Sequence, residues 1–99
     1  MIGEDFFDII DNVTQIFRPN VELKVYPNPV SEYAIFELEN VEDSDFTFKL
    51  FDAVGRLQVV DDFSGNAYRF YRKKLKSSLY YFQIEEAGKL LVTGKLVLK

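Results

Sequence analysis

The sequence contains no histidine and no cysteine among its 99 residues. Without histidine there is no Ser-His-Asp triad and no imidazole ligand for a metal, and without cysteine there is no thiol nucleophile, zinc knuckle or disulfide. Tryptophan is absent too, and only five glycines and three prolines are present. The scattered glycines form no phosphate-binding loop. We therefore expect no cofactor, and carboxylates are the main remaining candidates for catalytic groups.

Positive charge is scarce overall, and its distribution along the chain is uneven. The formal net charge is −4, which argues against nucleic acid as a partner. Residues 1–65 carry four basic and fourteen acidic side chains, whereas residues 66–99 carry eight basic and two acidic ones. We expect the two halves to pair within one fold; a docking face is the alternative. No apolar run is long enough to span a bilayer, and the first residues lack the basic region of a signal peptide.

The chain divides into a helical and a β-rich part. Apolar residues recur at helical spacing over residues 5–17, and Pro19 ends this run, so we expect an amphipathic helix there. Residues 1–21 would then be a helical appendage or linker. From residue 22 the apolar period is two, with turn signals every 8–12 residues, which indicates seven strands. These are expected around residues 23–25, 33–38, 46–50, 56–60, 68–71, 80–84 and 89–99. Residues 22–99 are thus predicted to form a seven-stranded antiparallel β-sandwich of immunoglobulin-like kind.

Two acidic clusters are the candidates for chemistry. Asp43 and Asp45 flank Ser44 in a turn, and Asp61 and Asp62 are adjacent near a strand end. Neighbours on a strand point to opposite faces, so Asp61 and Asp62 do not resemble the facing carboxyls of a glycosidase. The first cluster could supply oxygen ligands for Ca²⁺, but it lacks the glycine and the distal glutamate of an EF-hand loop. We interpret both clusters as solvated turn residues and predict no metal site.

Basic and aromatic side chains alternate in residues 68–76. The basic members are Arg69, Arg72, Lys73, Lys74 and Lys76. Such a strip suits phosphates or sugars, whereas the plainer interpretation is a charged edge strand that resists aggregation. A carbohydrate-binding or adhesive module is therefore an alternative function. It would require several of its candidate tyrosines to be exposed on one face, and these are Tyr33, Tyr68, Tyr71 and Tyr81.

The last predicted strand runs to the final residue of the sequence. One face is expected to carry Leu90, Val92, Gly94, Leu96 and Leu98. Domains more often end in a few disordered polar residues. The strand therefore has either a structural role or a role in recognition. Gly94 in its middle predicts a bulge or a close approach of another segment.

Four motifs, in order and spacing, resemble the type IX secretion system C-terminal sorting domain, also called the Por secretion tail. The first is Tyr26-Pro27-Asn28-Pro29 before a strand, and the second is the hairpin LFDAVGRL that contains Gly55. The third is LKSSLYY, with Tyr80 and with Ser78 where the family has glycine. The fourth is Gly94-Lys95-Leu96-Val97 near the end of the sequence. The resemblance covers about residues 22–99, and residues 1–19 do not share it.

The resemblance implies a sorting signal and not an enzyme. The domain would follow a cargo domain on the same chain, cross the periplasm, and be recognised by the outer-membrane translocon before reaching the cell surface or the medium. A sortase-like peptidase would then cleave between residues 17 and 22. We expect the translocon to recognise Gly94, Lys95, Leu96, Val97 and Lys99. A third interpretation is a structural homo-oligomer that pairs through the helix at residues 5–17.

Overall fold

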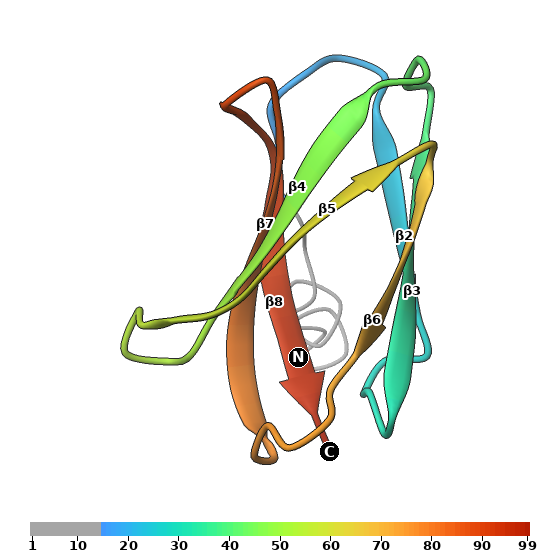
Figure 1. Ribbon diagram of the computed structural model, residues 1–99. Coiled ribbons are helices and arrows are strands. Elements are labelled where there is room, and N and C mark those ends of the chain that lie inside the picture. Colours follow the sequence, from blue (N-terminus) through green and yellow to red (C-terminus); the bar gives the residue numbers. More distant parts are fainter. Residues whose placement is uncertain (1–14) are drawn as a thin grey trace, which may run out of the picture.

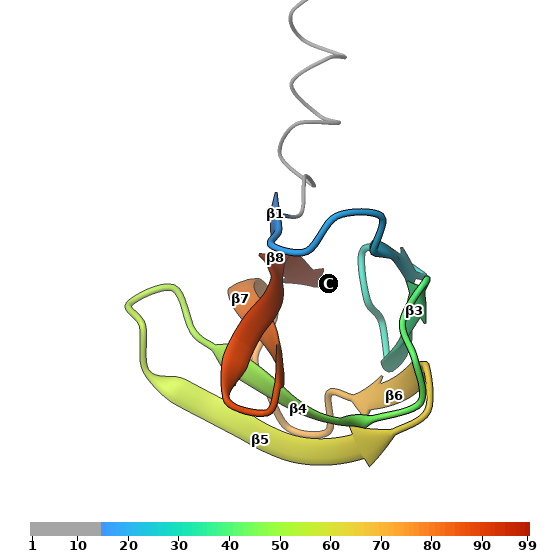
Figure 2. The same cartoon turned by 90° about the horizontal axis from the view of Figure 1, so that it is seen from above.

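The computed structural model describes residues 15–99, which form a β-sandwich of eight antiparallel strands in two sheets (Figure 1). The strands are β1 (Gln15–Ile16), β2 (Glu22–Tyr26), β3 (Tyr33–Glu39), β4 (Asp45–Phe51), β5 (Leu57–Ser64), β6 (Ala67–Tyr71), β7 (Ser78–Glu86) and β8 (Lys89–Leu98). One sheet has the order β1-β8-β7-β4-β5, and the other has the order β2-β3-β6. Seen from above, the larger sheet curves around one side of the core and the smaller sheet covers the other side (Figure 2).

The predicted all-β sandwich is confirmed, but the strand count is not. Strands β2 to β8 correspond to the seven predicted strands, and β1 is an additional one. Gln15 and Ile16 were assigned to the end of the predicted helix, yet they pair with Thr93 and Val92 of β8. No helix occurs in residues 15–99, and hence none there that could cross a membrane. The remainder of the predicted helix lies outside the described residues.

Alternation of apolar side chains places the core between the sheets. Each of β3, β4, β6 and β7 alternates buried residues with more exposed ones, as a half-buried strand requires. Aromatic rings fill the centre: the ring centroid of Phe36 lies 4.9 Å from that of Phe48 and 5.0 Å from that of Phe82. Buried apolar area of this kind is the main source of stability in a small domain. The remaining members of the core include Val30, Leu50, Phe70, Ile84 and Leu96.

Strand β8 departs from simple alternation at Leu91. Ile84 pairs with Val92 and Glu85 pairs with Leu90, so Leu91 is the extra residue of a bulge. Both Leu91 and Val92 are therefore buried, which breaks the face predicted for the last strand. The predicted bulge at Gly94 is wrong, because Gly94 pairs regularly with Phe82.

Turns join the strands largely as the sequence indicates. In the β4–β5 hairpin, the Gly55 N–H donates to the carbonyl of Asp52 at 2.9 Å, and Gly55 has a φ of +91°, a conformation that glycine adopts at low cost. Ala87 and Gly88 form the two-residue β7–β8 turn, with φ of +52° and +78°. Ser78, which replaces the glycine of the family motif, lies in extended β7 and needs no positive φ.

Candidate functional site

The end of β8 is hydrogen-bonded to the rest of the fold at one end of the sandwich (Figure 1). Leu98 forms a parallel bridge with Val30, which lies between β2 and β3. The Val30 N–H donates to the carbonyl of Val97 at 2.9 Å, and the Lys99 N–H donates to the carbonyl of Val30 at 2.8 Å. Val30 and Leu98 are at most 1% exposed. The last residues of the sequence therefore belong to the packed structure.

The Tyr26-Pro27-Asn28-Pro29 motif brings Val30 to this bridge. Proline has no N–H to donate to a ladder, so β2 ends at Tyr26 and the chain turns. Both peptide bonds that precede a proline in the motif are cis. The motif thus ends β2 and delivers Val30 to the edge of β8, in the other sheet.

Arg72 connects three segments at this end, namely the stretch before β3, the end of β8 and its own β6–β7 connection, a role that the sequence alone did not reveal. Its Nη1 donates to the main-chain oxygens of Ser31 (3.1 Å) and Lys99 (2.5 Å). Its Nη2 donates to the carbonyl of Leu75 (2.8 Å) and to the Oγ of Ser77 (3.3 Å). The planar guanidinium can bond several acceptors at once, unlike a lysine ammonium. We call this set of bonds the Arg72 clamp.

The third motif, residues 75–81, lies at the same end of the sandwich. The Leu75 N–H donates to the carbonyl of Arg72 at 3.0 Å, which closes a tight turn. The hydroxyl of Tyr80, whose ring is buried, donates to the carbonyl of Lys76 at 2.7 Å. The turn of the β4–β5 hairpin, including Ala53 and Val54, lies across a shallow groove from this segment. All four motifs therefore contribute to one region of the molecule.

The predicted recognition residues divide between core and surface. Leu96 is fully buried and Gly94 is half-buried, whereas Lys95, Val97 and Lys99 are exposed. Leu96 cannot contact a partner while the domain is folded. The outward-facing residues can, so they are the candidates for recognition.

The exposed members of β8 continue a partly apolar surface over the outer face of the five-stranded sheet. Lys95 pairs with Tyr81, and Val97 pairs with Leu79. Tyr81 pairs on its other side with Phe51 of β4. Tyr81 and Val97 are 38% and 39% exposed, respectively. The surface formed by these five residues is called the β7–β8 face below.

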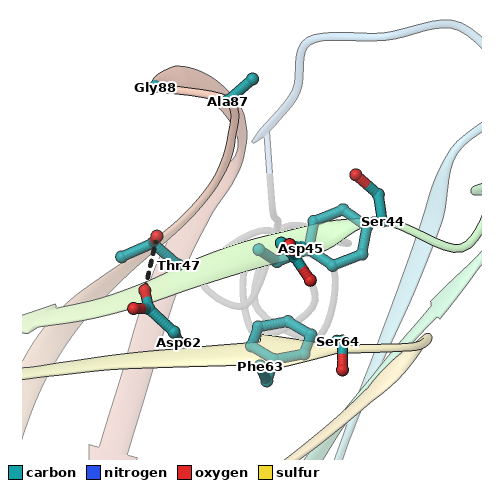
Figure 3. A pocket seen from close by; sticks show the side chains of 9 residues that line it. Ser44, Asp45, Thr47, Asp62, Phe63, Ser64, Ala87 and Gly88 are labelled. Carbon is teal, nitrogen blue, oxygen red and sulfur yellow. Dashed lines mark hydrogen bonds between the residues drawn. The ribbon is translucent and has the colours of Figure 1, made fainter.

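The carboxyls of the two acidic clusters have different surroundings. Asp61 accepts a hydrogen bond from the hydroxyl of Tyr68 at 2.5 Å, and burial, aided by Asp61, raises the pKa of Tyr68. Asp62 lies on the opposite side of β5 and accepts from the Oγ1 of Thr47 at 2.9 Å (Figure 3). Asp45 borders the same open groove as Asp62 (Figure 3). Residues 15–99 contain no cluster of three or more potential metal-binding side chains.

Within the described residues, ion pairs do not join the two halves of the chain in the way that the charge distribution predicts. Four are present among residues 15–99. Two of them link the halves, and in both the acidic partner comes from the second half: Arg18 with Glu86 at 2.7 Å and Lys49 with Glu85 at 3.1 Å. In the part of the chain that the structure describes, the second half's basic residues are thus not neutralised by carboxylates of the first.

The fold belongs to the class of immunoglobulin-like β-sandwiches. It is similar to a DUF3244 family protein of Bacteroides vulgatus, with a TM-score of 0.71 and 14% identity, over 90% of this chain and 97% of that one. It is also similar to part of the dimeric latent PorU of Porphyromonas gingivalis, with a TM-score of 0.57 and 17% identity, over 80% of this chain and 9% of that one. Both identities are low, so these similarities establish the fold alone.

The sequence identifies the family within this class. Residues 24–99 match the family model of the secretion system C-terminal sorting domain. The chain therefore belongs to the Por secretion tail family, the C-terminal sorting domains of type IX secretion. This confirms the resemblance carried by the four motifs. No curated protein matches the sequence.

Proposed function

We propose that the domain is a non-catalytic signal that directs a cargo domain preceding it on the chain through the type IX system to the cell surface. The supporting observation is the family match together with the convergence of all four motifs on one end of the sandwich. The folded domain would pass through the periplasm and then be recognised by the outer-membrane translocon. Export would end at the outer-membrane surface or in the medium.

We place translocon recognition on the exposed residues Lys95, Val97 and Lys99, with the β7–β8 face around them. Side chains of both an apolar and a basic kind are available there, and buried Leu96 acts by holding the strand in place. The partner surface that fits is apolar at its centre and acidic at its rim. Gly94 pairs with the buried Phe82 and lies on the other face of the strand from Lys95, so it is not part of this exposed surface.

The minimal signal should include residues upstream of residue 22. Val21 is 4% exposed and belongs to the core, and β1 pairs with β8. A fragment that begins at residue 22 would lose both. The export test therefore uses residues 1–99 fused behind a signal peptide and a fluorescent reporter, in a bacterium with the type IX system and in the same strain without the translocon. Reporter outside the first strain and trapped in the periplasm of the second supports a sorting signal.

A matched pair of substitutions separates recognition from folding. Val97→Asp places a charge on the β7–β8 face, and Val60→Asp makes the same change on the outward side of β5, where Val60 is 50% exposed. We expect the first variant to remain in the periplasm and the second to be exported, with both shown to be folded by their melting curves. Export of both variants would remove the proposed recognition surface. Deletion of β8 is a poor test, because it removes the buried Leu91, Val92, Leu96 and Leu98.

We propose that the peptidase of this system cleaves between residues 17 and 22. This stretch is exposed at Pro19 and Asn20, is bonded to β8 and β7 through the two residues before them, and ends at the buried Val21. The Phe17 N–H donates to the carbonyl of Leu91 at 2.9 Å, and Arg18 pairs with Glu86. Mass spectrometry of the released domain should give a new N-terminus in this stretch. Recovery of an uncut domain on exported cargo would contradict the proposal.

A further inference from the structure

The outer face of the three-stranded sheet carries exposed tyrosines from all three of its strands. Tyr26, Tyr33 and Tyr71 come from β2, β3 and β6 and are 45%, 38% and 52% exposed. Tyr33 and Tyr71 are direct cross-strand neighbours, with ring centroids 6.1 Å apart and planes at 41°. Tyr26 pairs with Ile35, two residues along β3 from Tyr33. We call this surface the tyrosine platform.

A cation lies on the tyrosine platform. The guanidinium carbon of Arg69 is 5.1 Å from the centroid of the Tyr33 ring, a cation–π distance. None of the four ion pairs among residues 15–99 involves Arg69. Lys73 and Lys74 lie just beyond Arg72 after the end of β6, and both are exposed. Residues 15–99 carry twelve basic and twelve acidic side chains, so this concentration of positive charge is local.

The platform adjoins a groove between the two sheets. Strands β5 and β6 are the edges of their sheets and approach each other (Figure 1). The groove between them has a volume of about 520 Å³ and is lined on one side by Tyr71, Arg69 and the two lysines, and on the other by Gln58 and Val60. Asp61 is the one carboxylate among the lining residues, and it is bonded to the hydroxyl of Tyr68.

The combination of these groups points to one class of ligand. The C–H face of a sugar ring stacks on a tyrosine ring, and the rigid phenol adds a hydroxyl for hydrogen bonding. A neutral sugar would use the tyrosines and leave the cations without a partner, whereas a simple phosphate would use the cations and leave the rings bare. A saccharide that bears carboxylate or sulfate groups uses both.

We infer that the tyrosine platform and its groove bind an acidic saccharide. This is a second binding function, on a different sheet from the β7–β8 face, and it does not depend on the sorting role. A sugar ring would lie on Tyr71, the most exposed of the three tyrosines, with acidic groups at Arg69, which covers the Tyr33 ring, and at Lys73 and Lys74. The sequence analysis had suggested such a module from four tyrosines. Of these, Tyr68 is buried and Tyr81 lies on the other sheet, while Tyr26 joins the platform.

The test measures binding of the chain of residues 1–99 to dextran sulfate, neutral dextran and polyphosphate by titration calorimetry. We expect dextran sulfate to bind more tightly than either, because neutral dextran lacks the charge and polyphosphate lacks the sugar ring. Tyr71→Ala should weaken dextran sulfate binding about tenfold, and Arg69→Gln should weaken it and reduce its salt dependence.

Matched controls lie on the opposite sheet. Tyr81→Ala and Lys95→Gln remove the same kinds of side chain from the β7–β8 face and should change binding less than about twofold, within the range expected for a distant site. Equal losses for Tyr71→Ala and Tyr81→Ala would overturn the inference, as would an absence of dextran sulfate binding. Tight polyphosphate binding that Tyr71→Ala leaves unchanged would also overturn it, because the site would then recognise charge alone. Melting curves confirm that each variant is folded.

Discussion

Removal of the Arg72 clamp should destabilise the end of the sandwich at which the motifs converge. The guanidinium makes four hydrogen bonds to three main-chain oxygens and one hydroxyl. A hydrogen bond to a charged group contributes about 1.5–3 kcal/mol. Three of these four bonds are solvent-exposed, and bonds that share one side chain do not add. We therefore expect Arg72→Ala to lower the free energy of unfolding by about 2 kcal/mol.

The loss should be visible both globally and locally. In a domain of this size, 2 kcal/mol corresponds to a fall in Tm of roughly 10 °C. Amide hydrogen exchange should report the local effect, because the N–H groups of Val30 and Lys99 are bonded beside the clamp. Both should exchange faster in the variant, while the N–H of Leu38, which is bonded to the carbonyl of Asn66 at the other end of the sandwich, should change less. Arg72→Lys keeps the charge but not the fork of donors, so it should recover less than half of the loss.

Arg69→Ala is the matched control for the clamp. Arg69 precedes Arg72 by three residues, and it lies over the ring of Tyr33 instead of bonding the end of β8. An exposed cation–π contact contributes about 0.5–1 kcal/mol, so this variant should lose no more than that. Equal unfolding of the two variants, or unchanged exchange at Val30 and Lys99 in Arg72→Ala, would show that Arg72 does not stabilise this end of the sandwich.

Three further predictions concern turns, titration and core. Gly55→Ala should lower the free energy of unfolding by about 1–2 kcal/mol, because the positive φ is unfavourable for alanine and no atom beyond the neighbouring residues lies within 4 Å of the added carbon. Ala87→Gly should raise stability by a similar amount, because glycine relieves the same strain at residue 87. Denaturant midpoints that move in the opposite directions would contradict these two predictions. Hydrogen bonds from the Arg56 backbone, and then from its side chain, lower the pKa of Asp52, so the unfolded chain takes up this proton first and stability should fall as the pH drops below about 4. Asp52→Asn should make this loss of stability at low pH smaller. An unchanged loss in the variant would show that other carboxyls cause it. Phe36→Ala should cost about 3–5 kcal/mol in urea unfolding, because the ring is fully buried among other rings; a loss below 1 kcal/mol would show that the core refills the space.

Much of the fold follows from the sequence because its signals are local. The period-two alternation identifies Phe46, Phe48 and Leu50 as core residues, and the DAVG segment specifies its own turn. Strand β1 was not predictable in this way, because Gln15 and Ile16 fit the helical spacing and form a strand only by pairing with β8. The burial of Leu91 was not predictable for a similar reason, since its bulge arises from the pairing of β8 with β7.

The site was less accessible to sequence reasoning than the fold. The sequence located the motifs but could not show that they meet, because Ser31 and Arg72 are 41 residues apart. Arg72 resembled the other members of a basic run, and its acceptors are mostly main-chain oxygens, which have no sequence signature. In the predicted recognition strand, Leu96 lies in the core and Val97 lies at the surface. The register of β8 with β7 decides which of the two faces the core, and the sequence does not give that register.

The position of β8 makes folding of the domain depend on synthesis through this strand. This strand lies between β1 and β7 and contributes four of the 17 buried apolar side chains of the described residues. A polypeptide that stops short of it leaves β7 with a bare edge and the facing sheet with an open apolar surface. Such a product would be a target for proteases and chaperones. Only a chain translated through β8 can fold in this way, so under the proposed function a receptor that binds the folded domain would also reject chains that stop before this strand.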